Sequence, residues 1–98
     1  MSDTYILDGH KAVQVAPDTW GRWLEKNDRV VAKTTIGESR VSTVFLGLDH
    51  RFGEGPPQIF ETLVFGGPLA DEMERYATWE EAEAGHQRMV ERVKEKAA

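Results

Sequence analysis

The sequence contains no cysteine and has a deficit of basic residues. Without cysteine the chain has no disulfide, no thiolate metal site and no cysteine nucleophile. Its 12 Lys and Arg residues are scattered among 17 Asp and Glu residues, for a formal net charge of −5. Because affinity for phosphate backbones comes largely from Lys and Arg, this balance argues against nucleic acid as the partner.

Long apolar runs are also missing. No run approaches the roughly 20 residues of a membrane-spanning helix, so no membrane contact is expected. The first residues lack the cationic segment followed by an apolar one that is typical of a signal peptide, which favours a cytoplasmic protein. The length of 98 residues suits a single domain, residues 1–98, and the 40% hydrophobic content is typical of a folded chain.

Turn signals between short apolar runs predict an antiparallel sheet. Asp8-Gly9 is a favoured two-residue turn and predicts a hairpin of residues 4–7 and 11–15. Further strands are expected at residues 29–36, 39–48, 58–65 and, as a short one, 73–77.

Two helices are expected. Pro17 and Asp18 indicate a helix start, with Asp18 as a cap, and tryptophans three residues apart indicate a short helix that docks on the sheet and ends near Asn27. The sequence from Thr78 to Glu81 matches a capping box and predicts a second helix over residues 79–94, with acids in its first turns and bases in its last.

The order of these elements predicts an α+β domain: an antiparallel sheet of about five to six strands, a short helix after the first hairpin, and a C-terminal helix packed on the sheet. Both faces of the strand that includes residues 41–48 are largely apolar. Either a helix or a second copy has to cover the second face, and a homodimer is expected.

The loop between the two central strands holds the densest group of polar side chains. Asp49, His50 and Glu54 could bind a metal or act as an acid–base pair, because histidine titrates near neutrality and a carboxylate can orient its ring. Adjacent residues of an extended chain point to opposite sides, however, and turn chemistry alone accounts for Asp, Gly and Pro. We therefore expect neither metal nor cofactor, and treat the loop as a structural or partner-contact segment. Its candidate binding residues are Asp49, His50, Arg51, Phe52 and Glu54.

Glu61 is the sixth candidate binding residue. It interrupts an apolar strand face, where a lone carboxylate is costly to bury. Either that face is partly open or Glu61 has a partner such as Arg40, Arg51 or a histidine, and a structural ion pair is the commoner case.

The other histidines and the known motifs point to no catalytic site. His86 lies on the apolar stripe of the last helix and is expected to be a hydrogen-bonded core residue, while His10 is expected to be solvated in the first turn. The HExxH, phosphate-loop and GxSxG patterns are absent.

The stretches VSTVFLGLDHRFGEGPPQIFETLVFGG and MERYATWEEAEAGH resemble a family of small proteins encoded in bacteriophages, prophages and bacterial genomes. The resemblance covers roughly the last 60 residues, and more weakly the first hairpin and helix. It carries over no established activity. Small phage accessory proteins often act by binding, including inhibition of host enzymes or defence systems, and the resemblance implies that setting rather than a site.

The expected function is therefore that of a small non-catalytic accessory binding protein, which inhibits or sequesters a host (defence) protein or a small ligand. The alternative is a small hydrolase or metal-dependent enzyme that uses His50, Glu61 and Asp49. Mimicry of nucleic-acid charge would need the acids of residues 69–83 to form one negative surface, which their alternation with bases disfavours.

Overall fold

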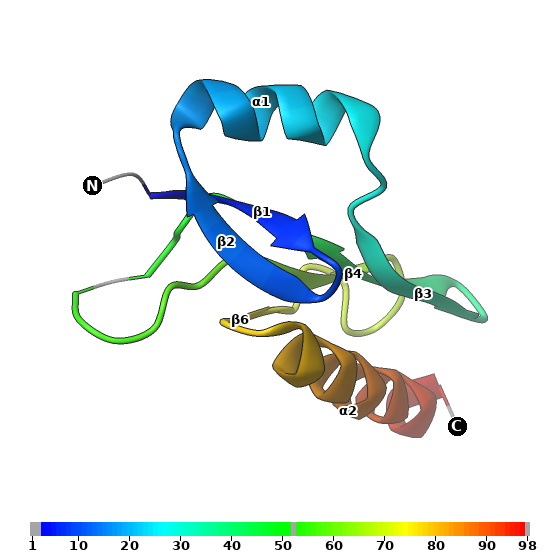
Figure 1. Cartoon of the computed structure of the whole chain (residues 1–98). Helices are drawn as coiled ribbons and strands as arrows, with labels where there is room; N and C mark the ends of the chain where they lie inside the picture. Colours follow the sequence, from blue (N-terminus) through cyan, green and yellow to red (C-terminus); the bar gives the residue numbers. More distant parts are fainter. Residues whose placement is uncertain (1–2, 52, 98) are drawn as a thin grey trace.

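The computed structural model describes residues 3–51 and 53–97 and shows an α+β fold (Figure 1). The elements in chain order are β1 (Thr4–Asp8), β2 (Lys11–Val15), α1 (Pro17–Lys26), β3 (Val30–Ile36), β4 (Ser39–Phe45), β5 (Phe60–Phe65), β6 (Met73–Tyr76) and α2 (Trp79–Ala97). Strands β1 and β2 form a two-stranded sheet, and the other four form a sheet in the order β3-β4-β5-β6. Every pairing is antiparallel, so the predicted fold class is confirmed.

The first turn lies one residue further along the chain than predicted. Asp8 pairs with Lys11 within the ladder, so the turn residues are Gly9 and His10 rather than Asp8 and Gly9. Gly9 takes the positive φ of 62° that such a turn requires, which a glycine adopts without steric cost.

Strand β4 ends at Phe45, three residues earlier than predicted, because the backbone changes direction at Gly47. Gly47 has a φ of 74°, in the left-handed region. Its carbonyl accepts a hydrogen bond of 2.7 Å from the Tyr5 N–H, and its own N–H donates to the Ile59 carbonyl at 3.2 Å. The chain around Gly47 thus lies between β1 and the residues that lead into β5, and it joins the two sheets.

Helix α1 docks as its tryptophans predict. The Trp20 indole N–H donates to the Leu46 carbonyl at 3.2 Å, and the Trp23 ring meets Phe45 edge-on at 5.6 Å between centroids. The predicted cap is wrong: the N-cap residue is Ala16, which makes no side-chain cap bond, and Asp18 forms an exposed ion pair with Arg22 instead. Packing of the two indoles, rather than a cap, fixes this helix.

Helix α2 begins with the predicted capping box and runs to Ala97, three residues further than expected. The Glu81 N–H donates to the Thr78 hydroxyl at 3.1 Å, and the Thr78 N–H donates to the Glu81 carboxylate at 3.2 Å. The backbone groups at the start of the helix are thereby satisfied before its apolar stripe begins.

The core lies between α2, the N-terminal elements and one face of the four-stranded sheet. One cluster joins the middle and end of α2 to β4 and β5: Val41, Val64, Met89, Val90 and Val93. The second lies under the hairpin, α1 and the start of α2: Phe45, Ile59, Phe60, Tyr76 and Ala82.

The opposite face of the four-stranded sheet contributes to neither core cluster. We call it the open sheet face; its residues include Arg40, Val44, Glu61, Leu63, Phe65, Met73 and Arg75. Phe65 and Met73 are 43% and 45% exposed, because α2 packs on the other side of their strands. The predicted second face is therefore not covered by α2, but it is not largely apolar, because Arg40, Glu61 and Arg75 lie among its apolar side chains.

Gly47→Ala should destabilise the protein by about 3 kcal/mol, since an added Cβ would approach the Trp20 indole and come within 2.7 Å of the Tyr5 carbonyl in a left-handed backbone. Gly9→Ala is the matched control. Its φ is also positive, but the added Cβ meets nothing within 4 Å, so about 1 kcal/mol is expected. Urea unfolding of both variants measures the difference, and equal losses would contradict the role of Gly47 as the joint between the sheets.

Candidate functional site

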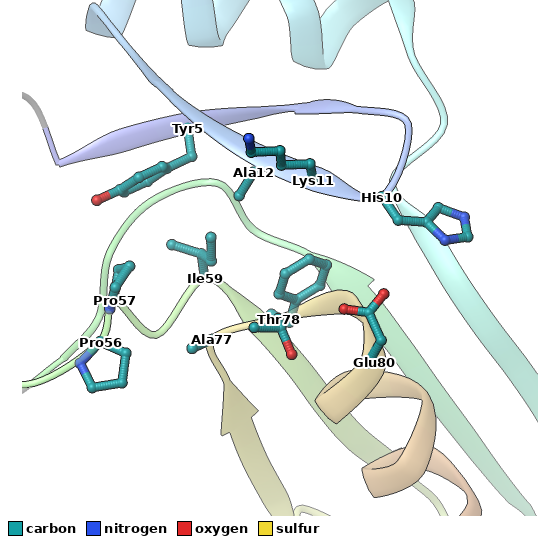
Figure 2. A pocket seen from close by; sticks show the side chains of 11 residues that line it. Tyr5, His10, Lys11, Ala12, Pro56, Pro57, Ile59, Ala77, Thr78 and Glu80 are labelled. Carbon is teal, nitrogen blue, oxygen red and sulfur yellow. The ribbon is translucent and has the colours of Figure 1, made fainter.

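A pocket of about 540 Å³ lies between the hairpin, the end of the 49–59 loop and the connection from β6 to α2 (Figure 2). This volume lies within the range of about 300–1,000 Å³ that is typical of ligand pockets. The lining residues are Tyr5, His10, Lys11, Ala12, Pro56, Pro57, Ile59, Phe60, Ala77, Thr78 and Glu80.

The lining is mainly apolar, with charged groups among it. Ile59 and Phe60 are 1% and 0% exposed and form part of the core as well as of the pocket. Figure 2 shows the hairpin side chains on one side, the two prolines at one end, and Ala77, Thr78 and Glu80 opposite the hairpin. An apolar surface with a lysine on one side and a carboxylate on the other suits an amphipathic ligand or the side chain of a partner.

Contacts with the rest of the structure fix the hairpin of β1 and β2 at both of its ends, and the pocket lies beneath it. At its base, the Tyr5 N–H bonds to Gly47. At its tip, the His10 ring stacks on Trp79 with centroids 3.8 Å apart and planes 7° apart. Trp79 in turn meets Phe60 edge-on at 6.3 Å. The sequence places His10 in a turn but gives no signal that its ring contacts the first residue of α2, 69 positions later.

Asp49 organises its loop. One carboxylate oxygen accepts hydrogen bonds from the N–H groups of Arg51 and Gln58, at 2.8 and 2.9 Å, and the other lies 2.8 Å from the Arg51 guanidinium. The Asp49 side chain is only 5% exposed, and Arg51 also donates to the Gly55 carbonyl. These contacts order the loop and place Pro56 and Pro57 at the pocket.

Of the loop candidates, only Arg51 is seen to contact Asp49 within the described residues. His50 and Glu54 are exposed, and Phe52 lies outside the described residues. Of the six candidate residues, those that the structure describes do not line the pocket. The loop contributes to the pocket through its two prolines, which on the sequence alone are attributed to turn chemistry.

Glu61 lies on the open sheet face, away from α2. Its carboxylate pairs with Arg75 on the neighbouring strand, with 3.1 Å between Nε and Oε2, and its side chain is 17% exposed. The face is partly open and Glu61 has the predicted ion pair, but its partner is none of those named from the sequence, Arg40, Arg51 or a histidine. That partner is Arg75, because β5 and β6 pair in a register that no local pattern reveals.

Two absences concern the residues that the structure describes. Residues 3–51 and 53–97 contain no group of three His, Cys, Asp or Glu side chains arranged to hold a metal ion. Neither helix, over its described length, is long and apolar enough to cross a membrane.

His86 belongs to a buried chain of hydrogen bonds. Its ring nitrogens lie 2.8 Å from the Thr34 hydroxyl and 2.7 Å from the Thr43 hydroxyl. The chain continues from Thr43 to Thr62 at 2.6 Å, and the Tyr76 hydroxyl donates to Thr62 at 3.0 Å. The prediction of a hydrogen-bonded core histidine is confirmed, and these bonds tie α2 to all four strands of the larger sheet.

Burial shifts the pKa of two members of this chain of hydrogen bonds, His86 and Tyr76. It lowers the pKa of His86 below its ordinary value of 6.5, because the imidazolium would lose hydration in the core. Burial likewise raises the pKa of Tyr76 above its ordinary value of 10.0. Both side chains are therefore neutral at pH 7, as a network of hydroxyls and one imidazole requires.

We expect the free energy of unfolding to fall as the pH drops from 7.5 to 5.5. A histidine with a lower pKa in the folded state binds protons better when unfolded, so the stability that neutral His86 contributes is lost as the pH falls below about 6.5. His86→Gln should remove most of this dependence, at a cost of roughly 1–3 kcal/mol at pH 7.5. Urea unfolding of the wild type and of His86→Gln across this range provides the test. Equal slopes for wild type and His86→Gln would refute it.

Comparisons with protein-family models, with curated proteins and with solved structures found no match to this chain. The resemblance to a phage and prophage family stays a prediction that these comparisons do not test.

Proposed function

We propose that this protein is a small non-catalytic binding protein that holds a partner or ligand in the pocket under the hairpin. The observation that carries this proposal is the pocket itself. Three chain segments build it, its inner surface includes the rigid core residues Ile59 and Phe60, and charged groups line it alongside the apolar ones. A preformed concave site of this composition is the usual form of a ligand site.

Of the three residues that the alternative enzyme would use, Asp49 and Glu61 are engaged in structural contacts, and His50 is exposed. Both oxygens of Asp49 hold its loop together, Glu61 pairs with Arg75, and both ring nitrogens of His86 face threonine hydroxyls. A general base needs a free lone pair within hydrogen-bond reach of its substrate. The alternative function, a hydrolase that uses His50, Glu61 and Asp49, stays a prediction, and these contacts favour binding over it.

The resemblance to phage and prophage proteins supports an accessory role in the cytoplasm. In that role the protein inhibits or sequesters a host (defence) protein or a small ligand. The pocket volume of about 540 Å³ suits either a small molecule or one or two side chains of a protein partner.

The same proposal includes a homodimer formed through the open sheet face. Leu63, Phe65 and Met73 form an apolar group on this face, and Arg40 lies over the Phe65 ring at 4.7 Å. A symmetric dimer brings the same patch of two copies together, so the apolar side chains of each copy cover those of the other. The face also carries charges of both signs, as a self-complementary surface needs, and it leaves the pocket accessible.

A screen of small organic fragments tests the pocket. Fragments added to the ¹⁵N-labelled protein should shift the amide signals of Ala12, Ile59 and Ala77, because these residues line one cavity. Ala77→Leu should weaken any such binding by about tenfold, since the larger side chain occupies the pocket. Ala84→Leu, on an exposed position of α2, is the matched control and should leave binding unchanged. Fragments that bind only elsewhere would contradict the proposed site.

Light scattering tests the dimer. We expect twice the chain mass of 11.1 kDa for the wild type and for Val13→Glu, whose exposed valine lies on the hairpin. Phe65→Glu should give a monomer, because it places a carboxylate in an apolar contact. Thermal unfolding checks that both variants are folded. A wild-type monomer at 100 µM, or a Phe65→Glu dimer, would exclude this interface.

A further inference from the structure

Strand β2 is the free outer strand of the hairpin. Its neighbour β1 is paired on both sides, with β2 on one side and with the chain at Gly47 and Leu48 on the other. Among the described residues, no strand pairs with the other edge of β2. A free strand edge is a template on which another extended chain can form backbone hydrogen bonds.

The hairpin register determines which backbone groups of β2 face this edge. Because the turn has two residues, the flanking pair of Asp8 and Lys11 is a hydrogen-bonded pair, and the next pair, Leu7 and Ala12, is not. The N–H and C=O of Ala12 therefore point away from β1, toward the outer edge. This places one free donor and one free acceptor beside the pocket that Ala12 itself lines.

Side chains alternate along β2 in a way that fits an added strand. Ala12 faces the core, where it packs beside the cluster of Phe45 and Phe60. Lys11 and Val13, the residues on either side of Ala12, are exposed, Val13 to 38%. A strand laid along the outer edge would place one side chain next to Ala12, in the pocket, and its two neighbours next to Lys11 and Val13.

We propose that the pocket and the edge of β2 together bind an extended peptide segment of a partner protein, which adds to the hairpin as a third strand. This inference rests on the proposed binding function and names the kind of partner. The residue opposite Ala12 is a large apolar or aromatic anchor that fills the pocket. The residue opposite Lys11 is acidic, by charge complementarity, and the residue opposite Val13 is apolar and β-branched. Backbone bonds to Ala12 supply affinity, and the pocket supplies specificity.

A display library of random linear 12-residue peptides, selected on the 98-residue chain, tests this. The selected peptides should share an apolar anchor with an acidic residue on one side and an apolar residue on the other. A synthetic peptide of the selected sequence should then slow hydrogen exchange of the Ala12 amide by about tenfold or more, because that N–H becomes a donor to the added strand.

Substitutions in β2 test the backbone and charge contacts separately. Ala12→Pro removes the outward N–H but no bond to β1, and should weaken peptide binding at least about tenfold. Ala12→Ser keeps this N–H, so it should weaken peptide binding less than Ala12→Pro does. Lys11→Glu, an exposed substitution that leaves the strand backbone intact, should also weaken binding, and a peptide with Lys in place of its acid should restore it.

Several results would overturn the inference. The first is hydrogen exchange of the Ala12 amide that the peptide leaves unchanged. The second is a set of peptide-induced shifts of amide signals centred on Leu63 and Phe65. The third is slower exchange of the Ala12 amide at higher protein concentration without peptide, which would mean that a second copy of the chain covers this edge. Fragments that bind the pocket while the library yields no peptide would overturn the added strand and leave the proposed function intact. If neither fragments nor peptides bind at the pocket, both proposals fail.

Discussion

The left-handed backbone at Gly47 is the constraint on which the remaining structure depends. It ends β4, directs one carbonyl to the Tyr5 N–H, and leaves room for the Trp20 indole where any side chain would collide. The N-terminal hairpin and α1 are attached to the larger sheet at this position. A β-branched or bulky residue there would force the hairpin away from Phe45, and the second core cluster would lose its cover.

The pocket follows from the way that the hairpin is held. Its base is fixed by backbone hydrogen bonds at Gly47 and its tip by the stacking of His10 on Trp79, while the middle of β2 spans a gap above Ile59. The stacking that fixes the tip carries a free-energy cost, because the Trp79 indole N–H is buried and has no hydrogen-bond partner in the described part of the chain. A concave site that depends on two distant contacts is preformed, so a ligand or peptide meets little entropic penalty for ordering it.

The hydrogen-bonded chain from Thr34 to Tyr76 has a different role, because it fixes how α2 lies on the sheet. Apolar packing alone tolerates small shifts of a helix, whereas His86 fits only where hydroxyls of β3 and β4 meet both ring nitrogens. Gly85, the residue before it, lets α2 approach the Tyr76 ring closely. One side of the sheet is thus tightly specified, whereas the open sheet face contributes to neither core cluster.

The sequence by itself determined the fold class, the capping box of α2, the docking of the two tryptophans, the core position of His86 and the partly open environment of Glu61. These features depend on local periodicity, on capping chemistry and on the cost of burying polar groups, all of which are written in neighbouring residues. The tertiary structure alone decided that Glu61 pairs with Arg75 and that the Asp49 carboxylate holds its loop together through hydrogen bonds. It also decided which residues line one pocket, among them His10, Ala12, Pro57 and Ala77. Strand register and long-range stacking bring these residues together from positions far apart in the chain, and no local pattern encodes such distances.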